Sequence, residues 1–199
     1  MAGEKLVERS VEADGFTIRR WEQGAGDPLV VLHGAGGPVP SVAQDLLAAN
    51  HRVLLFELPG FGEHPNDRSQ SLADLANIVV AAIDALGLER PHLMGTSFGG
   101  AVALHVALDH PGKVASIVLE APAAFRVGSV PPPAMSPEQM IKAFRRHPER
   151  EPVWTGPNPD VMRRAWPLVE RTLVATPEFD EGLTERMAAC DVRTLVLFG

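Results

Sequence analysis

The sequence contains one cysteine, Cys190, and no apolar run that approaches the length of a membrane helix. A single cysteine excludes a disulfide within the chain and is typical of a reducing compartment. We expect Cys190 to be a small core-facing residue near a helix end. A membrane helix needs about 18 or more apolar residues, and the charged residues 1–9 lack the apolar centre of a secretory signal. These absences predict a cytoplasmic protein.

Positive charge is also scarce, because 18 Lys and Arg face 25 Asp and Glu, for a net charge of -7. The sequence therefore gives no electrostatic reason to expect nucleic acid or an anionic membrane as a partner. The 199 residues are enough for one domain, or for a core with an insertion. A hydrophobic content of 45% with 22% charged residues is ordinary for a globular protein.

Short apolar runs alternate with amphipathic stretches along the chain. A hairpin is predicted over 6–12 and 16–21, because Asp14-Gly15 is a strong two-residue turn signal. Apolar runs predict buried strands, and apolar residues at helical spacing predict helices. The strands are predicted over 28–32, 52–58, 92–95, 114–119 and 192–199, and the helices over 42–49, 71–86 and 101–108. This alternation favours an α/β fold with a mostly parallel sheet covered on both faces.

The stretch Gly95-Thr96-Ser97-Phe98-Gly99 joins an apolar run to a helical one. A Gly-x-Ser-x-Gly on a strand-to-helix turn is typical of a nucleophile elbow, in which a tight turn exposes the serine hydroxyl. The glycines leave room for the neighbouring strand and helix. Free N–H groups and the dipole at the helix start favour negative charge beside Ser97. A Gly/Ser-rich turn without chemistry is the alternative, and the strand before and helix after it favour the elbow.

A second glycine-rich segment, residues 33–37, follows the strand predicted over 28–32. So much glycine keeps side chains away, so that backbone N–H groups can point at a ligand oxygen. A flexible loop is the alternative interpretation. A third segment, Pro59-Gly60-Phe61-Gly62, follows the strand predicted over 52–58.

In this order, the segments resemble the α/β-hydrolase fold superfamily, in its capped esterase and C–C-bond hydrolase branch. The resemblance covers nearly the whole chain and rests on residues 29–37, 54–62, 95–100 and 114–119. It implies that Ser97 is the nucleophile and that the N–H groups of Phe98 and Ala35 form the oxyanion hole, with Gly36 as second choice to Ala35. It also implies that His33 is structural and holds its loop rather than acting as the base.

Two positions near this motif set depart from the family's pattern or stay ambiguous. The family usually has Asp where Glu57 stands, so a structural hydrogen bond to the loop is expected to be rearranged. His64 and Asp67 are expected on the same side of the sheet as Ser97. A solvated loop explains them more simply than substrate contact.

After Pro122 the composition changes, and 11 of the 18 prolines lie between Pro122 and Pro177. Helices are predicted from 136, over 158–175 with a kink or break near Pro167, and over 179–190. The resemblance implies a helical cap inserted here. The predicted division is a core over 1–122, a cap over 123–190 and a return strand of the core over 191–199. Apolar cap residues that either line an acyl or aromatic site or pack within the cap are Met135, Met140, Phe144, Trp154, Trp166 and Leu168.

The resembled family orders its triad as serine, acid and histidine, and the sequence stops before the usual acid. None of the seven histidines matches the family's base position, and Glu120 is only a weak substitute acid. We expect the last strand or strands and helix of the fold to be missing and the 199 residues alone to be close to inert. The apolar run 195–198 would then form an open sheet edge that favours self-association.

The sequence therefore predicts a serine hydrolase that acts on a small ester or related carbonyl substrate, with no metal or organic cofactor implied. Two alternatives remain on the same fold: a non-catalytic binding protein and a cofactor-free haloperoxidase-like perhydrolase. An intact elbow and oxyanion loop argue against a pure binder, which needs neither. Ester, lactone, amide and C–C substrates are not distinguished.

Overall fold

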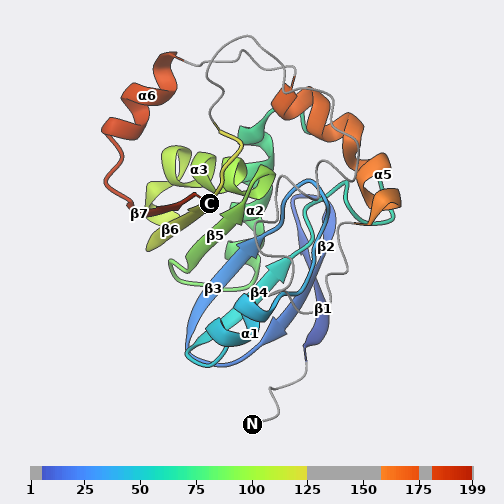
Figure 1. Cartoon of the computed structure of the whole chain (residues 1–199), viewed down its shortest axis with the longest axis vertical. Coiled ribbons are helices and arrows are strands. Elements are labelled where there is room, and N and C mark those ends of the chain that lie inside the picture. Colours follow the sequence, from blue (N-terminus) through green and yellow to red (C-terminus); the bar gives the residue numbers. More distant parts are fainter. Residues whose placement is uncertain (1–5, 125–157, 175–180, 199) are drawn as a thin grey trace.

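A computed structural model describes residues 6–124, 158–174 and 181–198 of the chain. Its centre is a seven-stranded sheet in the order β1-β2-β4-β3-β5-β6-β7 (Figure 1). β1 and β2 form an antiparallel hairpin, β2 is antiparallel to β4, and the remaining pairs are parallel. The strands are β1 (Val7–Ala13), β2 (Phe16–Gln23), β3 (Asp27–Leu32), β4 (His51–Phe56), β5 (His92–Thr96), β6 (Ser116–Glu120) and β7 (Arg193–Leu197). The mostly parallel α/β sheet predicted from the sequence is confirmed.

Helices lie on both faces of the sheet. The described helices are α1 (Val42–Leu47), α2 (Leu72–Ala85), α3 (Phe98–Asp109), the 3₁₀ turn η1 (Pro111–Lys113), α5 (Pro159–Val169), the π-helical turn η3 (Glu170–Val174) and α6 (Glu181–Ala188). The main core lies between the sheet and α2 and α3, and a smaller cluster on the other face includes Leu47 and Ala48 at the end of α1. On this second face the described helix α1 packs only near β3 and β4. No helix in the described ranges is long and apolar enough to cross a membrane.

The sequence features that set α2 are all present in the structure. Ser71 caps the helix, and Asp74 closes a reciprocal capping box with it. The N–H of Gln70 also donates to the Asp74 carboxylate and lowers the pKa of that group. Gly87 ends the helix with φ of 63°, a backbone conformation that glycine adopts without strain. The helix is therefore fixed at both ends and buries one apolar face on the sheet.

The hairpin turn at Asp14-Gly15 also forms as predicted. Both residues have positive φ, 49° and 74°, which matches the twist that a two-residue hairpin needs. The turn places Val11, Phe16 and Ile18 against the main core, so the hairpin packs as part of the sheet.

The described cap-region helices follow β6 in the chain and precede β7 (Figure 1). The helix predicted over 158–175 is continuous through Pro167, and its regular geometry changes only at Glu170, where the π-helical turn begins. The kink or break expected near Pro167 is found as a change from α-helical to π-helical geometry at Glu170. Proline removes one backbone donor without forcing a stop at its own position. The helix predicted from 136 lies outside the described residues. The division into core, cap and return strand stays a prediction.

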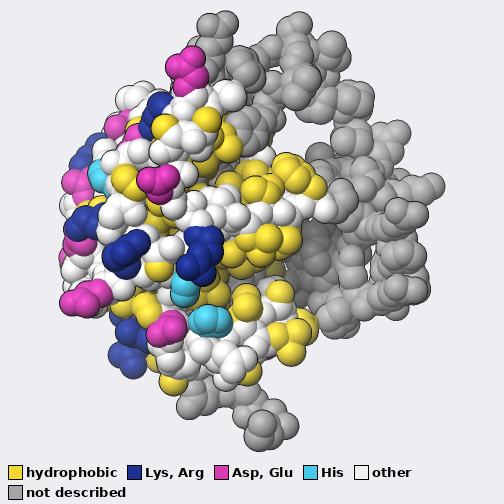
Figure 2. Space-filling model, turned by 90° about the vertical axis from the view of Figure 1, so that its left-hand side faces the viewer, with side chains coloured by type: hydrophobic (Ala, Val, Ile, Leu, Met, Phe, Trp, Pro, Cys, Tyr) yellow, Lys and Arg dark blue, Asp and Glu magenta, His cyan; other side chains and the backbone are white. Residues whose placement is uncertain are grey.

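The strand β7 forms the open sheet edge that the sequence predicts for residues 195–198, but it is not the buried strand predicted over 192–199. It pairs with β6 on one side only and is the last strand of the sheet. Its apolar side chains are exposed, and Figure 2 shows hydrophobic side chains open on the face where this edge lies. The exposed fractions are 54% for Leu195, 46% for Val196, 42% for Leu197 and 73% for Phe198. An edge strand buries its side chains only where helices cover it, so an apolar sequence alone did not determine burial.

The exposed apolar residues 195–198 at the sheet edge predict self-association of the 199-residue chain. Unpaired backbone groups beside exposed apolar side chains template pairing with another strand. Light scattering should therefore give a mass above that of a monomer, and the combined substitution Leu195→Lys and Leu197→Lys should return the mass to that of a monomer. Leu46→Lys on α1 removes a side chain that is 71% exposed but lies off the sheet edge, so it should leave the association intact. A monodisperse monomer for the unmodified chain would contradict this prediction.

Candidate functional site

Ser97 lies at the sharp turn between β5 and α3. Its backbone has φ of 50° and ψ of -110°, which is unusual for a non-glycine residue and costs conformational energy unless the surroundings hold it. The N–H of Ser97 donates to the Glu120 carbonyl over 2.9 Å, and the Ser97 carbonyl accepts from the N–H of Ala123 over 3.0 Å. The end of β6 and the segment after it therefore hold the strained turn in place.

The two glycines that flank Ser97 permit this turn because the backbone around them is too close for a side chain. A Cβ on Gly95 would lie 2.2 Å from the Gly99 carbonyl oxygen. A Cβ on Gly99 would lie 2.5 Å from the carbonyl oxygens of both Leu32 and His33. The start of α3 therefore packs directly against the end of β3. This contact fixes the position of Ser97 at the carboxyl end of the parallel strands.

The glycine-rich segment after β3 lies against the serine. A Cβ on Gly34 would be 3.5 Å from the Ser97 Cβ, in ordinary contact. The N–H of Gly37 donates to the Gly34 carbonyl over 3.1 Å and closes a turn with Ala35 and Gly36 at its centre. The N–H of Phe98, the first residue of α3, has no acceptor within its helix, as at any helix start. Candidate oxyanion donors therefore come from two segments that meet at Ser97.

His33 fixes the base of this segment through ring hydrogen bonds to the backbone of Gly34 and Leu58. The N–H of Leu58 donates to Nε2 over 3.0 Å, so Nδ1 carries the ring proton and donates to the Gly34 carbonyl over 2.7 Å. Burial lowers the pKa of His33 to about 4, and its ring lies edge-on to Phe61 with centroids 4.6 Å apart. Its contacts are those of a neutral residue that joins the loops after β3 and β4.

Glu57, the residue that departs from the family pattern, is buried and joined to β2. Its two carboxylate oxygens accept from Nε and Nη2 of Arg19 over 2.9 and 2.8 Å. These hydrogen bonds raise the pKa of the Arg19 guanidinium. Glu57 Oε2 would also lie 2.5 Å from a Cβ on Gly62, so the carboxylate fills the space beside the turn after β4. The longer side chain is accommodated by a bidentate ion pair to the hairpin.

Glu120, the weak substitute acid, ends β6 beside the residue that precedes the serine. Its Oε2 accepts from the Thr96 hydroxyl over 2.6 Å. The Glu120 side chain is exposed, and among the described residues no histidine contacts it. Its observed contact ties the ends of β5 and β6 together.

The described histidines do not supply a base to Ser97. His92 Nδ1 lies 2.8 Å from the Ser116 hydroxyl, and His110 Nε2 lies 2.7 Å from the Asn77 side chain. His105 Nδ1 lies 3.5 Å from the Asp109 carboxylate within α3. His51 lies edge-on to His92, and His64 is exposed. In the parts of the chain that the structure describes, no histidine is therefore hydrogen-bonded to Ser97.

The helix α5 covers the segments that flank Ser97. A Cβ on Gly37 would meet Val161 Cγ1 at 2.8 Å, and a Cβ on Gly60 would meet Leu168 Cδ2 at 2.8 Å. Leu168 is buried by this contact, whereas Trp166 is 49% exposed. The other four apolar residues considered for substrate contact, Met135, Met140, Phe144 and Trp154, lie outside the described residues.

Ser97 and Phe98 are consecutive at the elbow, and Ala35 lies in the turn that begins at Gly34 beside Ser97. The assignment of these three residues as site residues stays a prediction.

Sequence reasoning missed Arg19 as the partner of Glu57. It also missed Arg171 in η3, which donates to backbone carbonyls of the loop after β4. Both contacts join segments that lie far apart in the chain. Cys190 lies partly buried, with its Sγ 3.6 Å from the Ala107 carbonyl. Within residues 6–124, 158–174 and 181–198, no group of three or more His, Cys, Asp or Glu side chains is placed to hold a metal ion.

The close contact at the elbow predicts that Gly95→Ala is strongly destabilising. The added methyl group meets backbone atoms that cannot rotate away, so we expect a loss of about 2–3 kcal/mol in the free energy of unfolding. Gly112→Ala is the matched control, because no atom lies within 4 Å of its Cβ position, and its effect should stay within about 0.5 kcal/mol. Urea unfolding measures both. Equal stabilities for the two variants would show that the elbow is not packed in this way.

The buried, neutral His33 predicts a pH-dependent stability. Between pH 6.5 and about 4, the unfolded chain binds a proton at this position that the folded protein excludes, so stability is lost as the pH falls through this window. The loss from His33 between pH 7 and 5 should be about 2 kcal/mol.

Urea unfolding of His33→Gln at the two pH values should lack this part of the difference. The exposed residue His64 provides the control, and His64→Gln should keep the difference of the unmodified chain. A His33→Gln variant with an unchanged pH dependence would contradict the assignment.

Comparison with known proteins agrees with this geometry. The sequence profile of the alpha/beta hydrolase fold family matches residues 27–162. The chain is 35% identical over 120 residues to a 2-hydroxymuconate semialdehyde hydrolase from Pseudomonas sp. (strain CF600), a match that covers 57% of this chain and 42% of that protein. It is 39% identical over 120 residues to the dihydrolipoyllysine-residue acetyltransferase component of an acetoin cleaving system from Pseudomonas putida, covering 58% and 32%.

The structure resembles a serine hydrolase involved in carbazole degradation with a TM-score of 0.74, over 98% of this chain and 80% of that one. At 23% identity this likeness shows the fold alone. The chain spans between 32% and 42% of the length of the two curated relatives named above. Because the family profile matches more than half of the chain and the sheet has the corresponding topology, the chain belongs to the α/β-hydrolase fold family.

Proposed function

We propose that this chain is the nucleophile-bearing core of a serine hydrolase in which Ser97 attacks the carbonyl of a small ester or related substrate. The observation that carries the proposal is the strained elbow at Ser97, held against the glycine-rich segment 33–37. Backbone strain of this kind persists only where many surrounding contacts hold the residue in place, and such positions cluster at functional sites. The Ser97 hydroxyl belongs to a partly exposed residue, so a substrate can approach it.

The chemistry follows from the groups around the serine. The Ser97 oxygen attacks the substrate carbonyl carbon as a base removes its proton, and the carbonyl oxygen gains negative charge. The N–H groups of Phe98 and Ala35 donate to that oxygen, and one such donor typically contributes about 10²–10³ in rate. Loss of the leaving group then gives an acyl-serine, which water hydrolyses.

The base and the acid are proposed to lie outside the described residues. No described histidine is paired with Ser97, His33 is committed to Leu58 and Gly34, and Glu120 is hydrogen-bonded to Thr96. A hydroxyl without a base is a weak nucleophile, and loss of the base in such a triad costs on the order of 10⁶ in turnover. The 199 residues alone are therefore proposed to be close to inert.

The substrate class is proposed from the site and the named relatives together. The relative from strain CF600 is named for a semialdehyde, which is a carbonyl compound, and the relative from Pseudomonas putida is named for acetyl transfer. Both names are compatible with attack on a small carbonyl or acyl substrate. We propose such a molecule as the partner, with no cofactor. A cytoplasmic location stays a prediction.

The decisive variant is Ser97→Ala in the full-length protein. A fluorophosphonate probe should label the unmodified protein at Ser97, because only an activated serine reacts readily. Peptide mass spectrometry should find the label lost in Ser97→Ala and retained in Ser10→Ala, which changes an exposed serine on β1. A binding protein on this fold would remain unlabelled.

The 199-residue chain provides the second arm of this experiment. It should show no acylation burst with an activated ester, because the structure pairs no described histidine with Ser97. A burst that Ser97→Ala abolishes would show that a base is already present in these residues. Substrate assays on the whole protein, with peracid formation measured beside ester hydrolysis, separate a hydrolase from a perhydrolase.

A further inference from the structure

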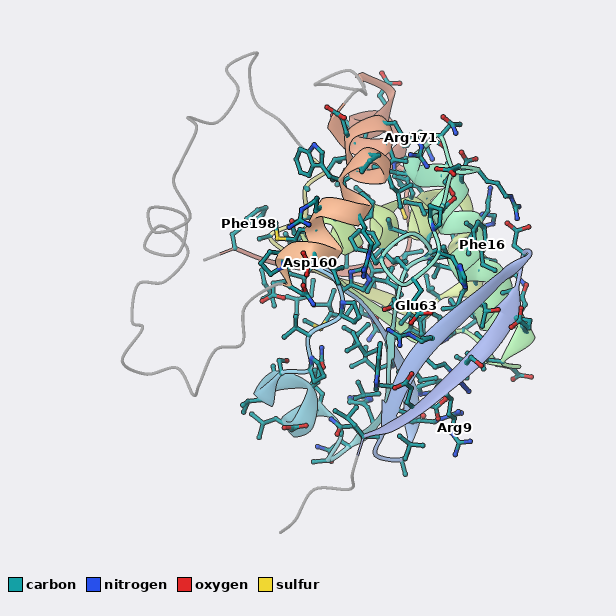
Figure 3. All side chains as sticks on the ribbon, turned by 90° about the vertical axis from the view of Figure 1, so that its right-hand side faces the viewer. Arg9, Phe16, Glu63, Asp160, Arg171 and Phe198 are labelled. Carbon is teal, nitrogen blue, oxygen red and sulfur yellow. The ribbon has the colours of Figure 1, made fainter. Side chains whose placement is uncertain are left out.

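Arg171 joins the end of α5 to the loop that follows β4. Its Nε donates to the Ser69 carbonyl over 2.8 Å, and its Nη2 donates to the Asn66 carbonyl in a short hydrogen bond. Figure 3 shows Arg171 extending from this end of α5 toward the segment that leads into α2. One guanidinium thus binds two backbone carbonyls from a segment about a hundred residues earlier in the chain.

The loop that receives Arg171 is preorganised by its own buried side chains. Asn66 and Ser69 are 3% and 2% exposed. The Asn66 amide donates to the Ser69 hydroxyl over 2.9 Å, and the N–H of Ser69 donates to the Asn66 side-chain oxygen over 3.1 Å. These mutual hydrogen bonds fix the spacing of the two main-chain carbonyls, so Arg171 meets a rigid acceptor pair.

Two contacts between α5 and the core are apolar, and one of them lies on the glycine-rich segment beside Ser97. Leu168 packs on Gly60, and Val161 packs on Gly37, whose N–H closes the turn that begins at Gly34 beside Ser97. Apolar contacts are non-directional and tolerate sliding, whereas two hydrogen bonds from a planar fork fix both position and direction. The angle of α5 over the glycine-rich segment therefore depends on Arg171.

The local helix geometry supports this role. The regular α-helix ends at Val169, and Arg171 lies in the π-helical turn that follows. Thr172, which is fully buried, returns its hydroxyl to the Leu168 carbonyl over 2.7 Å. Such π-helical turns are rare and occur frequently at functional sites. Here the turn directs the Arg171 side chain to the core while Leu168 and Thr172 stay buried.

We propose that Arg171 is a positioning residue that holds α5 across the entrance to Ser97 and thereby limits the size of the group that reaches this serine. The role of Arg171 in substrate choice rests on the proposed function. Its effect on access to position 97 does not. Without Arg171, α5 keeps its apolar contacts but loses the two hydrogen bonds to the loop after β4. The space above the glycine-rich segment then widens. The rate of reaction at position 97 therefore increases more for bulky reagents than for small ones.

The test measures access to position 97 in the full 199-residue chain without requiring catalysis. In a Ser97→Cys background, the alkylation rates by iodoacetamide and by a bulky maleimide are followed by peptide mass spectrometry, with Cys190 resolved as a separate peptide. Adding Arg171→Met should raise the ratio of the maleimide rate to the iodoacetamide rate by about tenfold. This change corresponds to about 1.4 kcal/mol in the free energy that excludes the bulky reagent. Arg171→Lys should lie between, because an ammonium group lacks the planar fork.

The matched control is Arg186→Met on α6. Arg186 also joins a cap-region helix to the core, through a hydrogen bond to Asp109 at the end of α3, but it does not contact α5 in the described structure. In Arg186→Met the ratio of the two alkylation rates should stay within about twofold of the ratio in the Ser97→Cys parent. An unchanged ratio in Arg171→Lys and Arg171→Met, or an equal rise in Arg186→Met, would overturn the proposal. If the unmodified whole protein were not labelled by a fluorophosphonate, that result would refute the proposed function and leave the role of Arg171 in access untouched.

Discussion

The contact between the start of α3 and the end of β3 is the constraint on which the rest of the site depends. At Gly99 the start of α3 lies so close to the end of β3 that no side chain fits between them. Gly95 permits an equally close approach between the end of β5 and the start of α3. These contacts hold Ser97 in a conformation that an isolated chain would rarely populate. The contact at Gly99 also places the segment that begins at Gly34 beside the serine. The helix start, with its free N–H groups, and the glycine-rich loop thereby converge on one hydroxyl.

Buried polar contacts then stiffen the loops around this point. His33 joins the loops after β3 and β4 through Gly34 and Leu58, and it does so as a neutral ring, since a buried charge would be costly. Glu57 is buried as well, but its carboxylate is satisfied by a bidentate contact with Arg19 on the hairpin. The hairpin at one end of the sheet is therefore connected to the turn after β4, and loops that would otherwise be mobile become part of the scaffold.

The features that the sequence predicted well are those with local causes. Asp14-Gly15 determines its own turn, and Ser71 with Asp74 starts its own helix. The elbow is equally local, because glycine spacing and flanking periodicity lie within a few residues of Ser97. What the sequence did not reveal depends on distant pairing. The partner of Glu57 becomes apparent only once β2 is known to pair with β4, and Arg171 reaches carbonyls far from it in the chain. For β7 the sequence led to two expectations, a buried strand and an open edge. The open edge is confirmed, because exposure depends on the strand's position at the end of the sheet rather than on its apolar sequence.

The most direct test of the account is an experimental structure of the whole protein with a small phosphonate bound covalently to Ser97. The phosphonate oxygen stands for the oxygen that carries negative charge during attack on a carbonyl. The account predicts this oxygen within hydrogen-bond distance, about 2.7–3.1 Å, of the backbone nitrogens of Phe98 and Ala35, with α5 closed over the adduct. A phosphonate oxygen that points to solvent, or an adduct on a different residue, would contradict the central claim that the elbow and the glycine-rich segment form one catalytic site.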